Sequence, residues 1–83
     1  MILTPLLKLI GDESRLSLLA VLEKGTRTVS ELVSLTNLSQ SLVSHHLRDL
    51  KDGGLVASEK DGRWVHYSLT HKGKRVMSAL GQI

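Results

Sequence analysis

The side chains best suited to chemistry in this chain lie between Leu38 and Val56. At about 100° per residue, an α-helix through this stretch gathers small polar and basic side chains on one face. In the major groove of DNA, glutamine can pair with adenine and arginine with guanine or phosphate. We therefore expect this helix to bind double-stranded DNA. Its expected contact residues are Ser39, Gln40, Ser41, Ser44, His45 and Arg48.

The side-chain types on this helix also predict how its two faces are used. Gln40 and His45 would read base edges, whereas the serines and Arg48 would mostly hold phosphates.

Because His45 and His46 point about 100° apart, one metal ion would not readily take both. We expect His46 to be a buried or half-buried histidine with a local hydrogen bond. The apolar face would pack on the core and consists of Leu42, Val43, His46, Leu47 and Leu50.

A short helix before the DNA-binding helix completes a helix-turn-helix. Residues Thr28–Glu31 fit a capping box, in which each side chain satisfies a backbone amide of the other residue. The link over residues 36–38 is short, and Ser39 is a suitable N-cap for the next helix. Two short helices joined by a tight turn are typical of this motif. The inward positions of the first helix would be Val29, Leu32, Val33 and Leu35.

The pattern changes to that of a β-hairpin after Gly53–Gly54. Strands over 55–60 and 63–69 would flank Asp61–Gly62, a dipeptide favoured in two-residue hairpin loops. A helix-turn-helix followed by a hairpin predicts a winged helix-turn-helix. The expected fold is mainly α, with five helices and a two-stranded antiparallel wing.

The side chains of the wing divide between a core face and an outer face. Alternation puts Val65, Tyr67 and Leu69 on the core face. Lys60 and Arg63 near the tip would reach a minor groove or phosphate, or protect an edge strand, and both roles can hold together. Trp64 lies on the outer face, where it either covers the hairpin or meets a partner.

Three further helices are expected outside the helix-turn-helix. Thr4–Pro5 is suited to open the first, and Asp12 to cap a second that runs to about Lys24. Thr70 can cap the last helix, which would begin at His71. The expected buried positions of the second helix are Leu16, Leu19, Ala20 and Leu22.

The apolar stripes of the two terminal helices predict a homodimer, because a domain of this size offers them little to pack against. The alternative is that they cover the core of one monomer. A symmetric dimer would place two DNA-binding helices about 34 Å apart, which suits inverted half-sites one turn apart. The expected interface residues are Leu3, Leu6, Leu7, Ile10, Val76, Met77 and Leu80.

Composition limits the possible classes of protein. The 83 residues predict one small domain over residues 1–83. Cysteine is absent, which excludes disulfides, thiolate catalysis and zinc fingers, and aromatic residues make up only 2%. No catalytic constellation or cofactor motif stands out, so we expect no enzyme and no cofactor. The apolar N-terminus resembles neither a signal peptide nor a membrane span, which favours the cytoplasm and no membrane partner.

The net charge of +3 is concentrated at the C-terminal end. Residues 60–83 contain five Lys or Arg and one acidic residue. A DNA backbone would pass the wing at this place, so the charge favours nucleic acid over an ordinary solvated surface. The basic first turns of the last helix, with Lys72, Lys74 and Arg75, oppose its macrodipole. They are either phosphate contacts or a plain solvated face.

Four segments in order and at the right spacing resemble the ArsR/SmtB family of winged-helix repressors. Residues 9–19 are similar to its opening "L-x-D-x-x-R-x-x-I-L" pattern, and residues 38–47 to its "S-Q-x-x-V-S-x-H-L" helix. Residues 50–56 resemble "L-x-x-x-G-L-V", and residues 62–69 the wing. Residues 69–73 also resemble the wing-to-helix junction of MarR- and PadR-type regulators.

The resemblance implies a homodimeric, autoregulatory repressor of an inverted-repeat operator that an inducer releases from DNA. The thiolate pair of the family's metalloid sensors would fall at Thr28 and Ser30, whose hard oxygen ligands are too weak for arsenite or cadmium. Of the family's zinc and nickel ligands, only His71 is near a matching position. We therefore expect no metal site and name no inducer. The alternatives are a protein-interaction module with this fold, or a metal sensor that uses clustered histidines such as His66 and His71.

Overall fold

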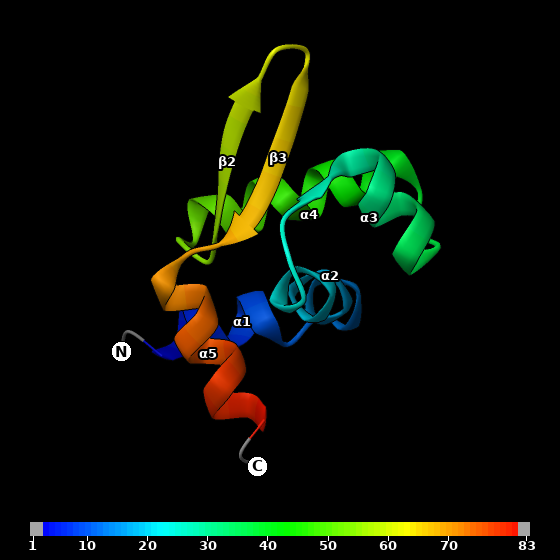
Figure 1. The fold of residues 1–83 in the computed structure, drawn as a ribbon. Coiled ribbons are helices and arrows are strands. Elements are labelled where there is room, and N and C mark those ends of the chain that lie inside the picture. The colour runs from blue at the N-terminus through cyan, green and yellow to red at the C-terminus, as the bar shows by residue number, and fades with distance from the viewer. Residues whose placement is uncertain (1–2, 82–83) are drawn as a thin grey trace.

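The computed structural model describes the backbone of residues 3–81 and the side chains of residues 6–81. Helices α3 (Val29–Thr36) and α4 (Gln40–Asp52) form the helix-turn-helix, and strands β2 (Val56–Asp61) and β3 (Trp64–Leu69) form the wing that projects from it (Figure 1). The predicted winged helix-turn-helix is thereby confirmed. The elements in chain order are α1 (Leu3–Ile10), α2 (Glu13–Glu23), β1 (Arg27–Thr28), α3 (Val29–Thr36), α4 (Gln40–Asp52), β2 (Val56–Asp61), β3 (Trp64–Leu69) and α5 (His71–Gly81).

The sheet has one strand more than the sequence predicts. Its order is β1-β3-β2, and both pairings are antiparallel. Strand β1 pairs Arg27 with Tyr67 and Thr28 with His66. Two residues are too short to show the alternating pattern of a strand, so β1 could not be predicted from the sequence. The short strand leaves β3 in the centre of the sheet and β2 at an edge.

The hairpin loop lies one residue later than predicted. Asp61 pairs with Trp64, so the two-residue loop is Gly62–Arg63 and not Asp61–Gly62. Gly62 has a φ of 62°, which a glycine adopts at no steric cost. Glycine at the first loop position is typical of a type II′ turn, whereas Asp-Gly favours type I′. The shift places Arg63 in the loop itself.

The core lies between α2, α4 and the sheet. Helix α2 packs against the other four helices and against β3, so it is surrounded on several sides. For this reason its buried residues do not follow the single stripe that we predict. Leu18 is buried, and Ala20 is exposed. Leu35 and Leu42 were also expected inside but are 54% and 38% exposed, because they lie where α3 and α4 meet at the outer corner of the motif. The buried apolar residues are Ile10, Leu18, Leu19, Leu22, Leu32, Val43, Leu47, Leu50, Leu55, Val56 and Leu69.

Four of the predicted helix caps are confirmed. Asp12 accepts from the Arg15 amide at 3.0 Å, and Ser39 accepts from the Leu42 amide at 3.1 Å. The caps at Thr28, in a complete capping box with Glu31, and at Thr70 are also present. The first helix differs, because α1 already includes Leu3 and places Thr4 and Pro5 inside its first turn. Proline fits there because first-turn amides have no acceptor within the helix.

The caps at Asp12 and Glu31 make stability depend on acid. Hydrogen bonds from the amides of Arg15 and Thr28 lower the pKa of these carboxyls below their ordinary values of 3.8 and 4.5. A carboxyl whose pKa is lowered in the folded state stabilises the fold at any pH above its ordinary pKa. This stabilisation is lost as the pH falls through the lowered pKa. Asp12→Asn and Glu31→Gln should therefore each lose less stability than the wild type between neutral pH and about pH 3.

Urea unfolding followed by circular dichroism at both pH values measures this loss. Glu23→Gln, at an exposed position of α2, removes a carboxylate from the same part of the chain and serves as the control. Acid sensitivity that stays unchanged in both cap variants would contradict the assignment.

Among the described residues, no helix is long and apolar enough to cross a membrane.

Candidate nucleic-acid interface

Helix α4 presents the predicted DNA-contact residues on its solvent side. Its buried residues Val43, His46, Leu47 and Leu50 hold the opposite side in the core. The helix is therefore fixed as a ridge along the surface, and its outer side chains are free to meet a groove. The six predicted contact residues are all exposed, namely Ser39, Gln40, Ser41, Ser44, His45 and Arg48.

His45 is held between two charged neighbours on this ridge. A nitrogen of the Arg48 guanidinium lies 2.9 Å from His45 Nδ1, and His45 Nε2 lies 3.5 Å from an oxygen of Asp49. Because a guanidinium only donates, Nδ1 accepts, and the ring proton lies on Nε2 facing the carboxylate. Both nitrogens of His45 are thus occupied within the helix. To read a base edge, as predicted, His45 must give up one of these contacts.

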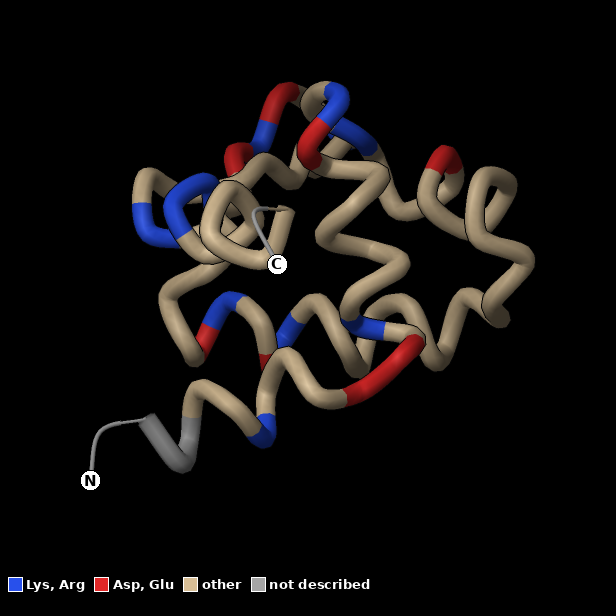
Figure 2. The backbone as a smooth tube through the Cα atoms, turned by 90° about the horizontal axis from the view of Figure 1, so that it is seen from below, with Lys and Arg blue, Asp and Glu red and all other residues tan. Residues whose placement is uncertain are grey.

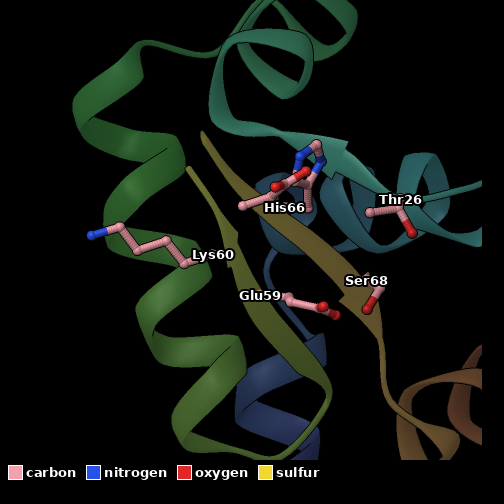
Figure 3. A pocket seen from close by; sticks show the side chains of 6 residues that line it. Thr26, Glu59, Lys60, His66 and Ser68 are labelled. Carbon is pink, nitrogen blue, oxygen red and sulfur yellow. The ribbon is translucent and has the colours of Figure 1, made fainter. Parts of the chain in front are cut away.

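Lys60 lies on the face of the wing that looks toward α4. Its neighbour on that face, Ser58, accepts a hydrogen bond of 2.7 Å from Lys51 of α4. Figure 3 shows the Lys60 side chain on the α4 side of the hairpin, opposite Glu59 and Ser68. Lys60 can therefore extend the basic surface that begins at Lys51. Since β2 is an edge strand, its charged residues also suit edge protection.

The opposite face of the wing is acidic and hollowed. A shallow hollow of about 370 Å³ lies there between the hairpin and the loop before β1. Alternation along β2 places Glu59 and Asp61 on this face, away from Lys60. The hairpin thus separates its charges, with the carboxylates turned away from α4. Lys60 also lines the hollow, although its side chain extends toward α4 (Figure 3), and the other lining residues are Thr26, Glu59, Asp61, His66 and Ser68.

Arg63 and Trp64 form a pair at the tip of the wing. The Arg63 guanidinium carbon lies 5.4 Å from the centre of the Trp64 ring, within cation–π range. Trp64 itself is 51% exposed and lines a hollow of about 210 Å³ that Thr28 and Val29 also line. In the structure the exposed Trp64 ring contacts its neighbour Arg63. The structure also places the ring beside the start of α3.

The basic residues of α5 do not all remain free for phosphates. Lys72 donates to the carbonyl of Gly53 at 3.1 Å and so caps the end of α4. This contact explains why a lysine lies against the macrodipole of α5. Lys74 and Arg75 are exposed. In Figure 2 the basic positions gather in the first turns of α5 and alternate with acidic positions along the hairpin.

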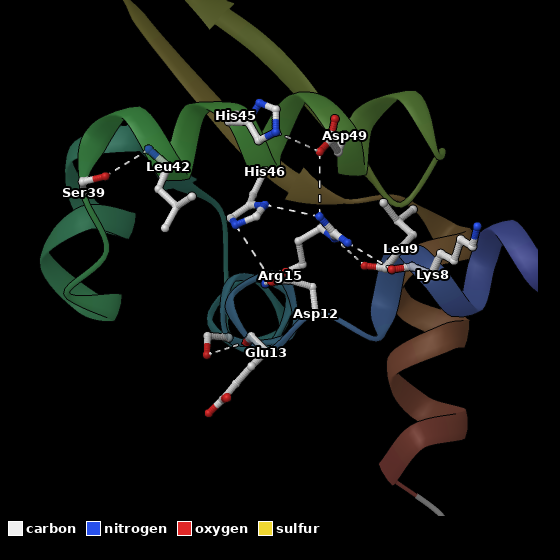
Figure 4. A network of polar contacts seen from close by, with 11 residues as sticks. Lys8, Leu9, Asp12, Glu13, Arg15, Ser39, Leu42, His45, His46 and Asp49 are labelled. Carbon is white, nitrogen blue, oxygen red and sulfur yellow. Dashed lines mark hydrogen bonds and ion pairs between the residues drawn. The ribbon is translucent and has the colours of Figure 1, made fainter.

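Sequence reasoning missed two charged residues that support α4 from behind. Arg15 of α2 and Asp49 of α4 lie 3.8 Å apart in a polar network that also holds His46 (Figure 4). His46 is 6% exposed, so its predicted burial is confirmed. Its nearest nitrogen partner comes from α2 and is not local, which corrects that part of the prediction. The only signal for Arg15 was its place in the "D-x-x-R" pattern.

The predicted dimer residues fall into three groups. Leu7 is 59% exposed, whereas Leu6, Val76, Met77 and Leu80 are partly buried against the core. Ile10 is 9% exposed and belongs to the core of the single chain, which leaves it little surface for a second copy. The side chain of Leu3 lies outside those described. Within residues 6–81, no three His, Cys, Asp or Glu side chains come close enough to hold a metal ion.

Comparison with known sequences identifies the family of this chain. The model of the bacterial regulatory protein arsR family matches residues 12–58. The arsenical resistance operon repressor of Escherichia coli K12 is 39% identical over 66 residues, 78% of this chain and 56% of that protein. The transcriptional activator HlyU of Vibrio cholerae is 39% identical over 75 residues, 90% of this chain and 69% of that protein. The chain thus spans only 56% of the length of the first of these relatives.

Solved structures agree with the sequence matches. HlyU from Vibrio cholerae N16961 superposes with a TM-score of 0.87 at 35% identity, over 98% of this chain and 89% of that one. The homodimeric winged helix-turn-helix DNA-binding domain of Mb0332 from Mycobacterium bovis has a TM-score of 0.84 at 27% identity, over 98% and 75%. The family model covers α2, the helix-turn-helix and the first half of β2, and these structures extend the likeness to both terminal helices. The chain belongs to the arsR family of bacterial regulatory proteins.

Proposed function

We propose that this chain is a single DNA-binding domain that regulates transcription by binding a specific double-stranded site. The observation that carries the proposal is the exposed polar ridge of α4, with Gln40, Ser44 and Arg48 along it. The ridge is flanked by Lys60 and Arg63 of the wing. Major-groove pairing by the ridge would supply sequence preference, and the wing would add affinity through phosphates or the minor groove. Such a protein acts where the DNA is, so the proposal carries the expected cytoplasmic location with it.

The active form in this proposal is a homodimer on an inverted repeat. Support comes from the exposed Leu7 on α1 and from the partly buried apolar residues of α5. The Mycobacterium bovis neighbour, whose match covers 98% of this chain, is described as homodimeric. Two copies joined through Leu3, Leu6, Leu7, Val76, Met77 and Leu80 would present two α4 helices about one DNA turn apart.

Fluorescence anisotropy tests the proposal with a labelled duplex from upstream of the chain's own gene and a scrambled duplex of the same length. We expect tighter binding to the first, with affinity that falls steeply as salt rises. Equal and weak binding to both duplexes would contradict autoregulation. Deletion of the gene in a reporter strain gives the sign of regulation, because a repressor predicts a rise in expression. A fall would instead match the description of HlyU as an activator.

Two variants should separate base reading from phosphate binding. Gln40→Ala should weaken binding to the specific duplex by roughly 1–3 kcal/mol and leave the scrambled duplex nearly unchanged, because it removes base contacts. Arg63→Ala should weaken both duplexes alike and lower the slope of affinity against salt. Anisotropy at several salt concentrations measures both effects. An Arg63→Ala loss confined to the specific duplex would contradict the phosphate role of the wing.

A further inference from the structure

A polar network lies between three helices, behind the face of α4 that the proposed function assigns to DNA (Figure 4). Arg15 of α2 stands at its centre, and its side chain is only 17% exposed. It reaches back to α1 and across to α4, and these two helices have different assigned tasks. Helix α1 carries the exposed Leu7 of the proposed dimer surface, and α4 carries the proposed DNA contacts.

The α1 side of the network is a pair of hydrogen bonds to the end of that helix. Arg15 Nε donates to the carbonyl of Leu9 at 2.5 Å, and Arg15 Nη2 donates to the carbonyl of Lys8 at 3.0 Å. Carbonyls in the last turn of a helix have no partner within it, and the end of the macrodipole favours a cation. A planar guanidinium can bind two adjacent carbonyls at once, so Arg15 fixes the end of α1 in both position and direction.

The α4 side of the network uses the remaining guanidinium nitrogen. Arg15 Nη1 lies 3.4 Å from Nδ1 of His46 and 3.8 Å from a carboxylate oxygen of Asp49. Because the guanidinium only donates, His46 Nδ1 accepts and Nε2 carries the proton, 3.9 Å from the carboxylate of Asp12. His46 is in turn buried in α4. Movement of α1 relative to α4 would therefore break contacts of two largely buried side chains, Arg15 and His46.

The same network continues to the DNA side of α4. Asp49 lies 3.5 Å from His45, and His45 lies 2.9 Å from Arg48. These two residues belong to the predicted DNA contacts. Only Asp49 thus separates Arg15 from His45, a predicted DNA contact, while Arg15 also contacts the end of α1 directly.

We infer that Arg15 is a positioning residue that locks α1 to α4 and thereby fixes the distance between the two DNA-binding helices of a dimer. This inference rests on the proposed function. With the lock in place, a dimer joined through α1 would accept one spacing between half-sites. Without it, each α4 would still read its half-site, but the pair would tolerate several spacings and bind the best one less tightly.

The experiment compares Arg15→Lys with the wild type on inverted repeats of graded spacing. Lysine keeps the charge and the aliphatic stem, but its single ammonium group cannot hold two carbonyls and α4 together. The parent duplex is the one that the wild type selects from a pool of randomised duplexes, and the series inserts or deletes base pairs between its halves. Lys24→Ala, at the exposed end of α2, is the control for loss of a nearby cation.

We expect the wild type and Lys24→Ala to show a sharp optimum of spacing. Arg15→Lys should lose about tenfold in affinity at that optimum, corresponding to about 1.4 kcal/mol, and should bind neighbouring spacings within a fewfold of it. Its affinity for a single half-site and its dimer dissociation constant should stay unchanged. General destabilisation would lower affinity at all spacings alike and would not flatten the profile.

Other results would overturn either the positioning role of Arg15 or the proposed dimer on an inverted repeat. A sharp wild-type profile that Arg15→Lys reproduces would overturn the positioning role and leave the proposed function intact. A uniform loss at every spacing would also overturn it. If the wild type selects no duplex or shows no spacing preference, the proposed dimer on an inverted repeat fails. Asp49→Asn keeps both bonds from Arg15 to α1 but removes the carboxylate charge that faces Arg15 and His45. It should give a weaker flattening of the profile, measured relative to its own affinity for a single half-site.

Discussion

Gly73→Ala should destabilise the domain by about 3 kcal/mol, which lowers Tm by roughly 12–24 °C for a chain of this size. A Cβ on Gly73 would lie 2.2 Å from the carbonyl oxygen of Leu55 and 3.3 Å from Leu69. The Leu55 oxygen cannot move aside easily, because it accepts a 3.0 Å hydrogen bond from the amide of Thr70. Leu55 is also fully buried. In Gly73→Ala the first turn of α5 must therefore move away from Leu55, the residue just before β2.

Thermal unfolding of Gly73→Ala measures this effect, and Gly81→Ala is the matched control. Both glycines belong to α5, but no atom lies within 4 Å of a Cβ built on Gly81. Alanine favours a helix over glycine, so Gly81→Ala should be neutral or slightly stabilising. A Tm for Gly73→Ala equal to that of the wild type would mean that α5 does not pack this closely on Leu55.

Arg48→Glu should reduce affinity for DNA on the order of 100-fold at low salt. The substitution removes a cation from the middle of the polar ridge of α4 and places a carboxylate where phosphates or base acceptors would approach. Juxtaposed like charges cost several kcal/mol, and each 1.4 kcal/mol is a factor of ten in affinity. The loss should shrink as salt rises, because salt weakens the electrostatic part of binding.

The fold should survive this reversal, because Arg48 is exposed and surface substitutions usually change stability by less than about 0.5 kcal/mol. Lys24→Glu changes the charge by the same amount at the end of α2 and controls for net charge alone. Anisotropy titrations of both variants, with circular dichroism to verify folding, give the comparison. If Arg48→Glu and Lys24→Glu bound equally well, the ridge of α4 would not be the DNA surface.

The parts of the fold that local chemistry determines could be predicted from the sequence. The caps at Asp12, Thr28, Ser39 and Thr70 are set by short-range hydrogen bonds, and the structure contains all four. The predicted apolar face of α4 is also correct except for Leu42, which is exposed. The pattern is clear because one side of that helix packs on the core and the other does not. Such features need no knowledge of distant parts of the chain.

The features that long-range packing determines could not be predicted. Leu18 is buried because α2 is surrounded on several sides, and a single stripe does not describe such a helix. Strand β1 exists only because β3 offers it an edge. The contacts of Arg15 with His46 and Asp49 join residues more than 30 positions apart. The loop shift to Gly62–Arg63 depends on strand register, which a turn dipeptide does not fix by itself.

In the proposed function the α4 ridge and the wing, and not the terminal helices, meet DNA. Amide chemical-shift mapping of the ¹⁵N-labelled chain with the selected duplex locates the contact surface residue by residue. We expect the shifts to concentrate at residues 39–48 and 60–63, with small changes in α2 and on the acidic face of the wing. Shifts that concentrate instead on α1 and α5, with the α4 amides unchanged, would contradict it.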